Sequence, residues 1–290
     1  MAAADCSRWR PAAIAARIAA SRTGQGALAC EPFPDIEVIP RECVTVAIAL
    51  PFQDCPIIEV RRYTLHPGLR QQLLDVFERH LIEPQEAVGM TVGGTFTDDD
   101  DPNVFTWLRG FADHESRRKS LEDFYHGPIW AEHRDRANAT MVSSDDVLLL
   151  RPTAPPRRPA PAVERGSEDD RPRKERALLG SFGVASDHDE SWWTSTGLRA
   201  LEDRLGVVVS AWRTDPTPNL FPALPVREDR AVSWLAVFAD AADRSAASAR
   251  LDSSGFVHEI ERRTSWYRLS RLTPTSRSAH PVCAPLSAAT

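Results

Sequence analysis

The sequence has little lysine, few cysteines and no long apolar run. Lys119 and Lys174 are its only lysines among 35 basic residues, and the formal net charge is −6. The charge therefore gives no overall attraction to nucleic acid or to an anionic membrane surface. The five cysteines include no C-x-x-C pair, so their spacing suggests neither a disulfide framework nor a zinc site. No run of 18 or more apolar residues occurs, and we expect no membrane-spanning helix.

The sequence also lacks the common motifs of phosphate and nucleophile chemistry. It has no G-x-G-x-x-G, no phosphate-binding loop and no G-x-S-x-G, so no nucleotide cofactor is indicated. We therefore expect neither a cofactor nor a metal. We also expect a cytoplasmic protein, because its cysteine usage fits a reducing compartment. We expect no nucleic-acid or membrane partner. A small-molecule ligand stays open as a partner, as does assembly as a homodimer rather than a monomer.

The N-terminal segment differs in composition from the rest. Residues 1–30 are rich in alanine and carry four arginines but one aspartate, which is typical of an organellar targeting segment. Arg17 and Arg22 interrupt any apolar core of such a signal. We therefore expect residues 1–56 to be a disordered extension or the result of a start site assigned too far upstream, with a targeting segment as the alternative.

Prolines and charges mark a boundary in the middle of the chain. Residues 154–176 are rich in both and have no apolar period, which is typical of a linker. The linker separates a first domain at 57–153 from a second at 177–277, and residues 278–290 form a tail.

The two domains have the same predicted order of elements, βαββαβ. In the first domain we expect strands at 57–65, 89–97, 104–111 and 146–152, with helices at 69–82 and, broken near 126–128, at 112–136. In the second domain we expect strands at 177–185, 207–213, 231–238 and 266–272, with helices at 191–205 and from 239 onward.

One line of sequence occurs in both domains. WLRGFADHESR begins at Trp107 and WLAVFADAADR begins at Trp234, so each covers the third strand and the start of the following helix. A βαββαβ unit forms a ferredoxin-like sheet with helices on one face and an open opposite face. Two such sheets can cover each other's open face. The predicted fold class is therefore α+β, with two ferredoxin-like βαββαβ repeats packed face to face as a fused, intrachain dimer.

Alternation along the strands groups several polar and aromatic residues on one face. The grouped residues are Glu59, Arg61, Tyr63, Trp107 and Arg109. The opposite faces carry smaller, mostly aliphatic side chains, which suit packing against helices. We therefore assign the grouped residues to the space between the two sheets.

Buried charges in that space need partners or a ligand. Glu59 can pair with an arginine in a purely structural network. Alternatively, Arg61 or Arg109 holds an anionic group while Trp107 or Tyr63 stacks on an apolar body. A filled interior with Glu59 satisfied by Arg61 would favour a packed, non-catalytic barrel.

The second domain lacks the charged set. Leu179, Ser181 and Gly183 stand near the positions of the first-strand candidates, and Ala236 takes the place of Arg109. Any site is therefore expected mainly in the first domain.

The predicted second helix of the first domain offers further candidates. Trp130, His133 and Asn138 combine side chains that can act as acid, base or oxyanion donor. An amphipathic helix surface is the alternative interpretation, and these residues are weak catalytic candidates.

Several stretches of the first domain carry a family resemblance: EVRRYTLHPG, VGMTVGGTF, the long stretch from DDPNVFTWLRGFAD to RDRANATM, and VLLLRP. With them the sequence resembles the NIPSNAP family of the dimeric α/β barrel superfamily. The second domain matches more weakly, through FPALPVRED, VSWLAVFAD and RLSRLTPTSRS, and the resemblance covers about 57–278.

The resemblance implies a fold, in which the two ferredoxin-like repeats form an intrachain dimeric α/β barrel, but no defined activity. Relatives in the wider superfamily include cofactor-independent monooxygenases, haem-degrading enzymes and proteins without known catalysis. The leading hypothesis is a family member of undefined activity that binds a small aromatic or anionic ligand between its sheets. The alternatives are a cofactor-independent monooxygenase acting on a quinol or polycyclic phenol, and a non-catalytic interaction protein. A shared fold does not establish a function.

Overall fold

The computed structural model describes residue 52, residues 54–153, residue 165 and residues 173–279. The predictions for most of the N-terminal extension and the linker, and for nearly all of the tail, lie outside the described residues. No helix in the described part is both long and apolar enough to cross a membrane.

The first half has four strands and two helical segments, as predicted. Its strands are β1 (Ile57–Leu65), β2 (Thr91–Asp98), β3 (Val104–Phe111) and β4 (Met141–Pro152). Its helices are α1 (Arg70–Val76), η1 (Phe77–Leu81), α2 (Ile82–Ala87), α3 (His114–Tyr125) and α4 (Pro128–Asn138). The segment η1 is a π-helical turn inside the first helix, a feature often found near functional sites.

The second half repeats this order. Its strands are β5 (Arg176–Val184), β6 (Ser210–Thr214), β7 (Ala231–Phe238) and β8 (Thr264–Pro274). Its helices are α5 (Asp187–Trp192), η2 (Trp193–Gly197), α6 (Leu198–Leu205), α7 (Ala241–Ser253) and α8 (Phe256–Arg262). A second π-helical turn stands in the first helix here too. The π turns therefore belong to the fold and do not by themselves mark a site.

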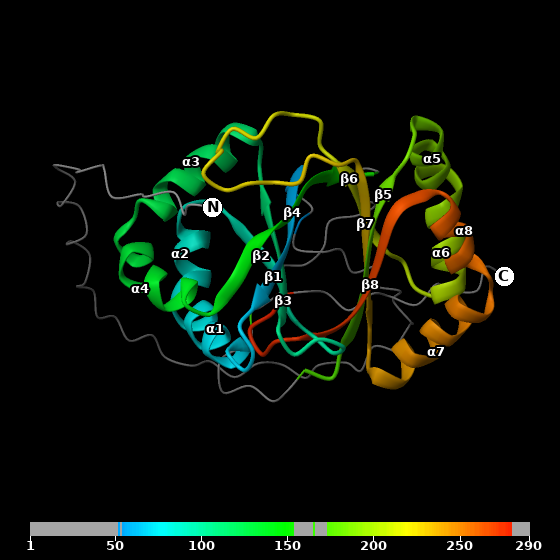
Figure 1. Cartoon of the computed structure of the whole chain (residues 1–290), viewed down its shortest axis with the longest axis horizontal. Coiled ribbons are helices and arrows are strands. Elements are labelled where there is room, and N and C mark those ends of the chain that lie inside the picture. Colours follow the sequence, from blue (N-terminus) through cyan, green and yellow to red (C-terminus); the bar gives the residue numbers. More distant parts are fainter. Residues whose placement is uncertain (1–51, 53, 154–164, 166–172, 280–290) are drawn as a thin grey trace, which may run out of the picture. The chain divides into compact units, whose positions relative to one another are not determined.

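The eight strands form one closed antiparallel barrel in the order β1-β3-β2-β8-β5-β7-β6-β4. The seams between the halves are short, with three residue pairs joining β2 to β8 and three joining β4 to β6. Figure 1 shows the helices of the first half on one side of the strands and those of the second half on the other. The α+β barrel with two βαββαβ halves is confirmed.

The interior of the barrel is filled by aliphatic and a few larger side chains from both halves. This shared core contains Phe52, Cys55, Ile58, Val60, Phe96, Leu108, Leu148, Leu150, Ala177, Leu179, Trp212, Ala231, Leu235, Val237 and Leu272. Each half has a further core of its own, which lies between its sheet and its helices. The interior is therefore a packed core.

Packed structure begins before the predicted domain start at Ile57. Phe52 and Cys55 are each 5% exposed. They lie over Gly93 and Gly110, where an added Cβ would come within 2.1 Å of the Phe52 ring and 2.6 Å of the Cys55 Cβ, respectively. Only glycine leaves room for this close approach.

The repeated sequence line has a structural explanation. Trp107 and Trp234 are buried beneath the helices of their own halves. Asp113 and Asp240 are the N-caps of α3 and α7, where each side chain accepts backbone N–H bonds of the first turn. The residues that the two stretches share thus determine, in each half, how the third strand leads into the following helix.

Several boundaries differ from the prediction. The first helix of the first half continues to Ala87, five residues beyond the predicted end. Strand β4 begins at Met141, five residues earlier than expected, because residues 141–146 pair with the far end of β1. Strand β6 covers only Ser210–Thr214, since its pairing with β7 starts at residue 210. Helix α5 is capped by Ser186, whose side chain accepts from Asp189 N.

Candidate functional site

The prediction that the five candidate residues face the space between the sheets is wrong. Tyr63 and Trp107 belong to the core between the first sheet and its helices, while Ile58, Val60 and Leu108 of the opposite faces fill the barrel interior. The grouping by alternation holds, but the two faces were exchanged. The physical reason is space: the barrel interior takes the aliphatic set, whereas the helices leave room for large aromatic and guanidinium groups.

The candidate residues are brought together around Glu59. Its Oε2 accepts hydrogen bonds from Arg61 Nη1 and Arg109 Nε, both at 2.7 Å. Its Oε1 accepts from Arg117 Nε at 2.7 Å. All four side chains are at most 1% exposed, so the ion pairs are desolvated and strongly directional. We call these four residues the Glu59 cluster.

The cluster fixes the ionisation of its carboxyl group. Burial alone would raise the pKa of Glu59, but the guanidinium groups of Arg109, Arg61 and Arg117 outweigh it and hold that pKa well below its ordinary range. Glu59 is therefore a permanent carboxylate and cannot serve as a general base near neutral pH. Three guanidinium groups against one carboxylate leave the cluster with a net charge of +2.

Sequence reasoning missed Arg117, which comes from α3 and not from the sheet. The only signal was the arginine shared by the two repeated lines, at 117 and 244. Arg244 makes a different contact, with Asp99 at 2.6 Å. The shared letter therefore does not mean a shared role.

Two polar residues connect the cluster with a cavity. Arg61 Nε donates to the hydroxyl oxygen of Tyr63 at 3.1 Å, and Arg109 Nη1 donates to Gln85 Oε1 at 3.2 Å. Both Tyr63 and Gln85 line the cavity. Burial raises the pKa of Tyr63, so its hydroxyl stays protonated and can donate its own hydrogen.

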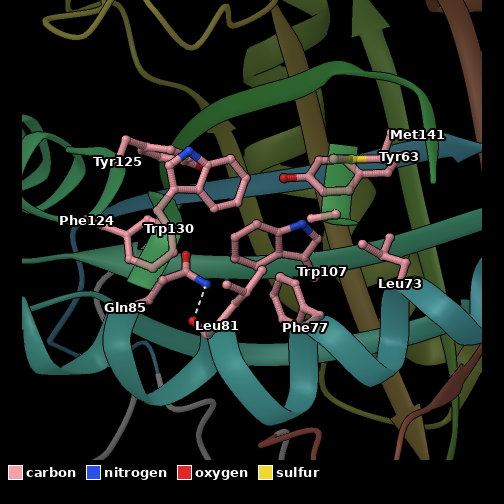
Figure 2. A pocket seen from close by; sticks show the side chains of 11 residues that line it. Tyr63, Leu73, Phe77, Leu81, Gln85, Trp107, Phe124, Tyr125, Trp130 and Met141 are labelled. Carbon is pink, nitrogen blue, oxygen red and sulfur yellow. Dashed lines mark hydrogen bonds between the residues drawn. The ribbon is translucent and has the colours of Figure 1, made fainter. Parts of the chain in front are cut away.

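The cavity lies between the first sheet and its helices, and Figure 2 shows its aromatic walls. Its volume is about 30 Å³, room for one or two water-sized groups. It is lined by Tyr63, Leu73, Phe77, Leu81, Gln85, Trp107, Phe124, Tyr125, Trp130, Ala137 and Met141. Tyr125, Trp130 and Met141 are the half-buried members of this set, so they form its outer side.

The weak catalytic candidates do not form one group. Trp130 lines the cavity, but Asn138 is exposed at the end of α4. The His133 ring stacks on His80 with centroids 4.1 Å apart, and neither histidine lines the cavity. Burial and the neighbouring His133 lower the pKa of His80. The structure therefore does not assemble the three candidates around one substrate.

A loop of the second half covers part of the first-half site. The loop between β6 and β7 reaches over α3, as the yellow segment of Figure 1 shows. Three contacts hold it there: Arg117 Nη1 donates to Asn219 Oδ1 at 2.9 Å, Phe221 stacks on Tyr125 at 6.2 Å, and His114 Nε2 lies 3.1 Å from Asp215 Oδ1. The first-half site is thus completed by the second half.

The second half lacks a corresponding cluster, as expected, but the predicted alignment was one residue off. Strand pairing places Leu178 opposite Ala236, Gly180 opposite Trp234 and Phe182 opposite Val232, whereas Glu59 stands opposite Arg109. A Cβ on Gly180 would lie 2.2 Å from the Trp234 ring. The tryptophan therefore fills the space that Arg61 occupies in the first half.

Residues 58–155 match the family described as NIPSNAP. The first half of the barrel is therefore similar to a NIPSNAP domain, and we call it the NIPSNAP half. The matched residues end before β5, so the second half lies outside the family match. Among curated proteins, none matches this sequence.

Solved structures give the wider context of the NIPSNAP half. A proposed monooxygenase from Fusobacterium nucleatum is 9% identical with a TM-score of 0.51, over 79% of this chain and 97% of its own. At that identity it shows the fold alone. A proposed monooxygenase from Lactobacillus acidophilus is 12% identical with a TM-score of 0.48, over 80% of this chain and all of its own. A NIPSNAP-like domain protein from Burkholderia xenovorans is 28% identical with a TM-score of 0.32, over 39% of this chain and 97% of its own.

Proposed function

We propose that the NIPSNAP half binds a small organic anion with an aromatic or apolar body. The body lies in the cavity beside Trp107 and Trp130. The anionic group accepts a hydrogen bond from the Tyr63 hydroxyl, with the guanidinium groups of Arg61 and Arg109 behind it. The proposal includes no chemical reaction. The catalytic candidates Trp130, His133 and Asn138 do not form one group, and Glu59 is held as a carboxylate.

The observation that carries the proposal is the unbalanced charge of the Glu59 cluster. Its net charge of +2 is buried, and the Nη2 atoms of Arg109 and Arg117 have no hydrogen-bond partner among the described residues. Buried cations without full compensation are costly. An anion in the adjoining cavity lowers that cost, and the Tyr63 hydroxyl, which accepts from Arg61, lines this cavity as a donor.

Two features favour binding over catalysis. The barrel interior is filled by the shared core, and Glu59 is satisfied by three hydrogen bonds, as a packed, non-catalytic barrel requires. We therefore propose binding without a reaction. The cavity must widen for a ring to enter, and the half-buried Tyr125 and Trp130 are the side chains able to swing outward.

The test compares matched anionic and neutral probes. Benzoate should raise the Tm of the full chain, and its neutral isostere benzamide should raise it less, at constant ionic strength. Tyr63→Phe should weaken benzoate binding about tenfold or more, since a hydrogen bond to a charged group contributes about 1.5–3 kcal/mol. Isothermal titration calorimetry measures the affinity, and Trp130 fluorescence should change on binding.

Tyr267→Phe is the matched control. Tyr267 lies in the second half, packs against its helices, and its hydroxyl has no partner among the described residues. Its removal should leave the benzoate affinity unchanged. Equal binding of benzamide and benzoate would contradict the anionic group. No binding of benzoate or the larger 1-naphthoate would remove the proposal.

A further inference from the structure

One end of the barrel interior carries charged side chains that take no part in the site proposed for the NIPSNAP half. Arg62 follows Ile58 and Val60 on the inward face of β1. It lines a small cavity with residues of both halves: Val60, Arg62, Asp146, Leu148, Leu179, Ser181, Arg268 and Ser270. The volume of this cavity is about 20 Å³. It is separate from the aromatic cavity, because the two share no lining residue.

Arg62 has no carboxylate partner among the described residues, although one stands directly opposite. Arg62 lies opposite Asp146 in the register of β1 and β4. Both oxygens of Asp146 are engaged elsewhere, since Oδ2 accepts from Arg268 Nη1 at 2.6 Å and Oδ1 accepts from Arg227 Nη1 at 3.1 Å. The Nε of Arg62 is buried and has no hydrogen-bond partner in the part of the chain that the structure describes.

The neighbouring acids are also satisfied. Asp229 accepts from Arg227 and from the indole of Trp266. Asp98 turns its carboxylate to the backbone N–H groups of residues 100 and 101. Burial lowers the pKa of Arg62, the neighbouring charge of Arg268 adds to this, and the carboxylates of Asp146, Asp98 and Asp101 oppose it.

The balance of charge in the lining of this cavity is positive, because its charged groups are Arg62, Arg268 and Asp146. Asp98 and Asp101 also act on Arg62, but neither lines the cavity. Arg62 as a whole is half-buried, but its Nε–H is withdrawn from water without an acceptor among the described residues, which costs free energy. The structure thus has a donor, a space and a local excess of positive charge at one place between the two sheets.

We infer that this end of the barrel binds a small monoanion, the size of a single carboxylate group, between Arg62 and Arg268. One oxygen accepts from Arg62 Nε, and the hydroxyl groups of Ser181 and Ser270 line the same space. Larger anions are excluded, because the cavity holds one or two water-sized groups. The site needs both halves, since Arg62 lies on β1 and Arg268 on β8.

Formate is the probe, and the Tm of the full chain is the readout. The reference is a bulky sulfonate buffer salt at equal ionic strength, which is too large to enter. Formate at ten times its Kd should raise the Tm by about 2–5 °C relative to that reference. Arg62→Gln should abolish the rise, and Arg62→Lys, which keeps the charge but loses the Nε–H, should weaken formate binding about tenfold.

Arg271→Gln is the matched control. Arg271 lies on the same strand as Arg268, is 55% exposed and pairs with Asp100. This variant should keep the full formate effect. An equal Tm rise in wild type and Arg62→Gln, or no rise above the sulfonate reference in wild type, overturns the inference. Benzoate binding is measured separately, so the two sites can fail independently.

Discussion

At the scale of single residues, Glu59 is the anion that makes the first-half core possible. Three arginines from β1, β3 and α3 converge on its two oxygens. Removing one partner of a buried ion pair is more damaging than removing both, because the remaining charge stays desolvated. Glu59 has three such partners, so its charge matters more than that of any one arginine.

Glu59→Gln is therefore expected to destabilise the protein by about 3–5 kcal/mol. Glutamine keeps the shape and can accept hydrogen bonds, but it leaves three buried guanidinium groups without an anion. Urea denaturation followed by circular dichroism measures the change. Glu202→Gln is the control, since Glu202 is 8% exposed and its side chain, among the described residues, accepts only a backbone bond, from Val209 N. A loss below about 1 kcal/mol in Glu59→Gln would contradict the role of the charge.

The same substitution should change the pH dependence of stability. The folded pKa of Glu59 lies below the unfolded value of about 4.3. Its contribution is therefore complete above that unfolded value and is lost as the pH falls toward the folded pKa. Wild type should lose this stability below about pH 4, and Glu59→Gln should lack that part of the acid transition. Parallel acid curves for the two proteins would contradict the assignment.

The residue scale also shows where sequence reasoning reached its limit. Alternation correctly placed Glu59 and Arg61 on one face and Val60 on the other, because strand geometry fixes it. It could not say which face is inward, since both faces of this sheet are buried. Arg117 could not be connected with Glu59 at all, because the contact joins residues 58 apart on different elements.

At the scale of elements, the β6–β7 loop joins the halves beyond the two strand seams. Arg227 N donates to Val147 O of β4 at 2.8 Å, and Asp215 N donates to Leu149 O at 3.0 Å. Phe221 is 7% exposed and belongs to the core of the first half. In the sequence, the stretch FPALPVRED carries only part of the family resemblance. Its contact with α3 was not predicted, since no periodic pattern relates a loop to a distant helix.

Phe221→Ala should loosen the cover over the aromatic cavity. Loss of a buried phenylalanine costs up to about 3–5 kcal/mol in a core, and this one lies at the core's edge. We expect faster hydrogen exchange in α3 and stronger acrylamide quenching of Trp130, which lies beside Tyr125 at 5.0 Å.

Leu220→Ala is the control for this loop, because Leu220 is adjacent in sequence but 41% exposed. It should leave exchange in α3 unchanged. If acrylamide quenching of Trp130 and hydrogen exchange in α3 are the same in both variants, the loop is not a cover and Phe221 acts only through general stability.

At the scale of the whole molecule, the duplicated order of elements predicted the barrel correctly. Each half leaves one sheet face open, and the closed barrel covers both. The prediction succeeded because it rests on the need to bury apolar area, which depends on composition more than on exact contacts. The start of the packed region was less predictable, because Phe52 and Cys55 show no periodic pattern that would join them to the barrel.

The shared interior core makes the two halves one cooperative unit. The core draws side chains from all eight strands, whereas the backbone seams contribute only three residue pairs each. Neither half can open its interior face without exposing the other. We therefore expect a single unfolding transition, with the same midpoint by circular dichroism and tryptophan fluorescence.

Leu272→Ala tests this coupling. Leu272 is fully buried in the second half, and the truncation should cost about 2–5 kcal/mol. If the halves unfold together, hydrogen exchange measured by mass spectrometry should accelerate equally in β3 and β7, although β3 belongs to the first half. Ala246→Gly, an exposed change on α7, should cost about 1 kcal/mol and accelerate exchange mainly in that helix. Loss of protection in β7 with β3 unchanged would mean that the short seams, and not the common core, set the boundary of cooperativity.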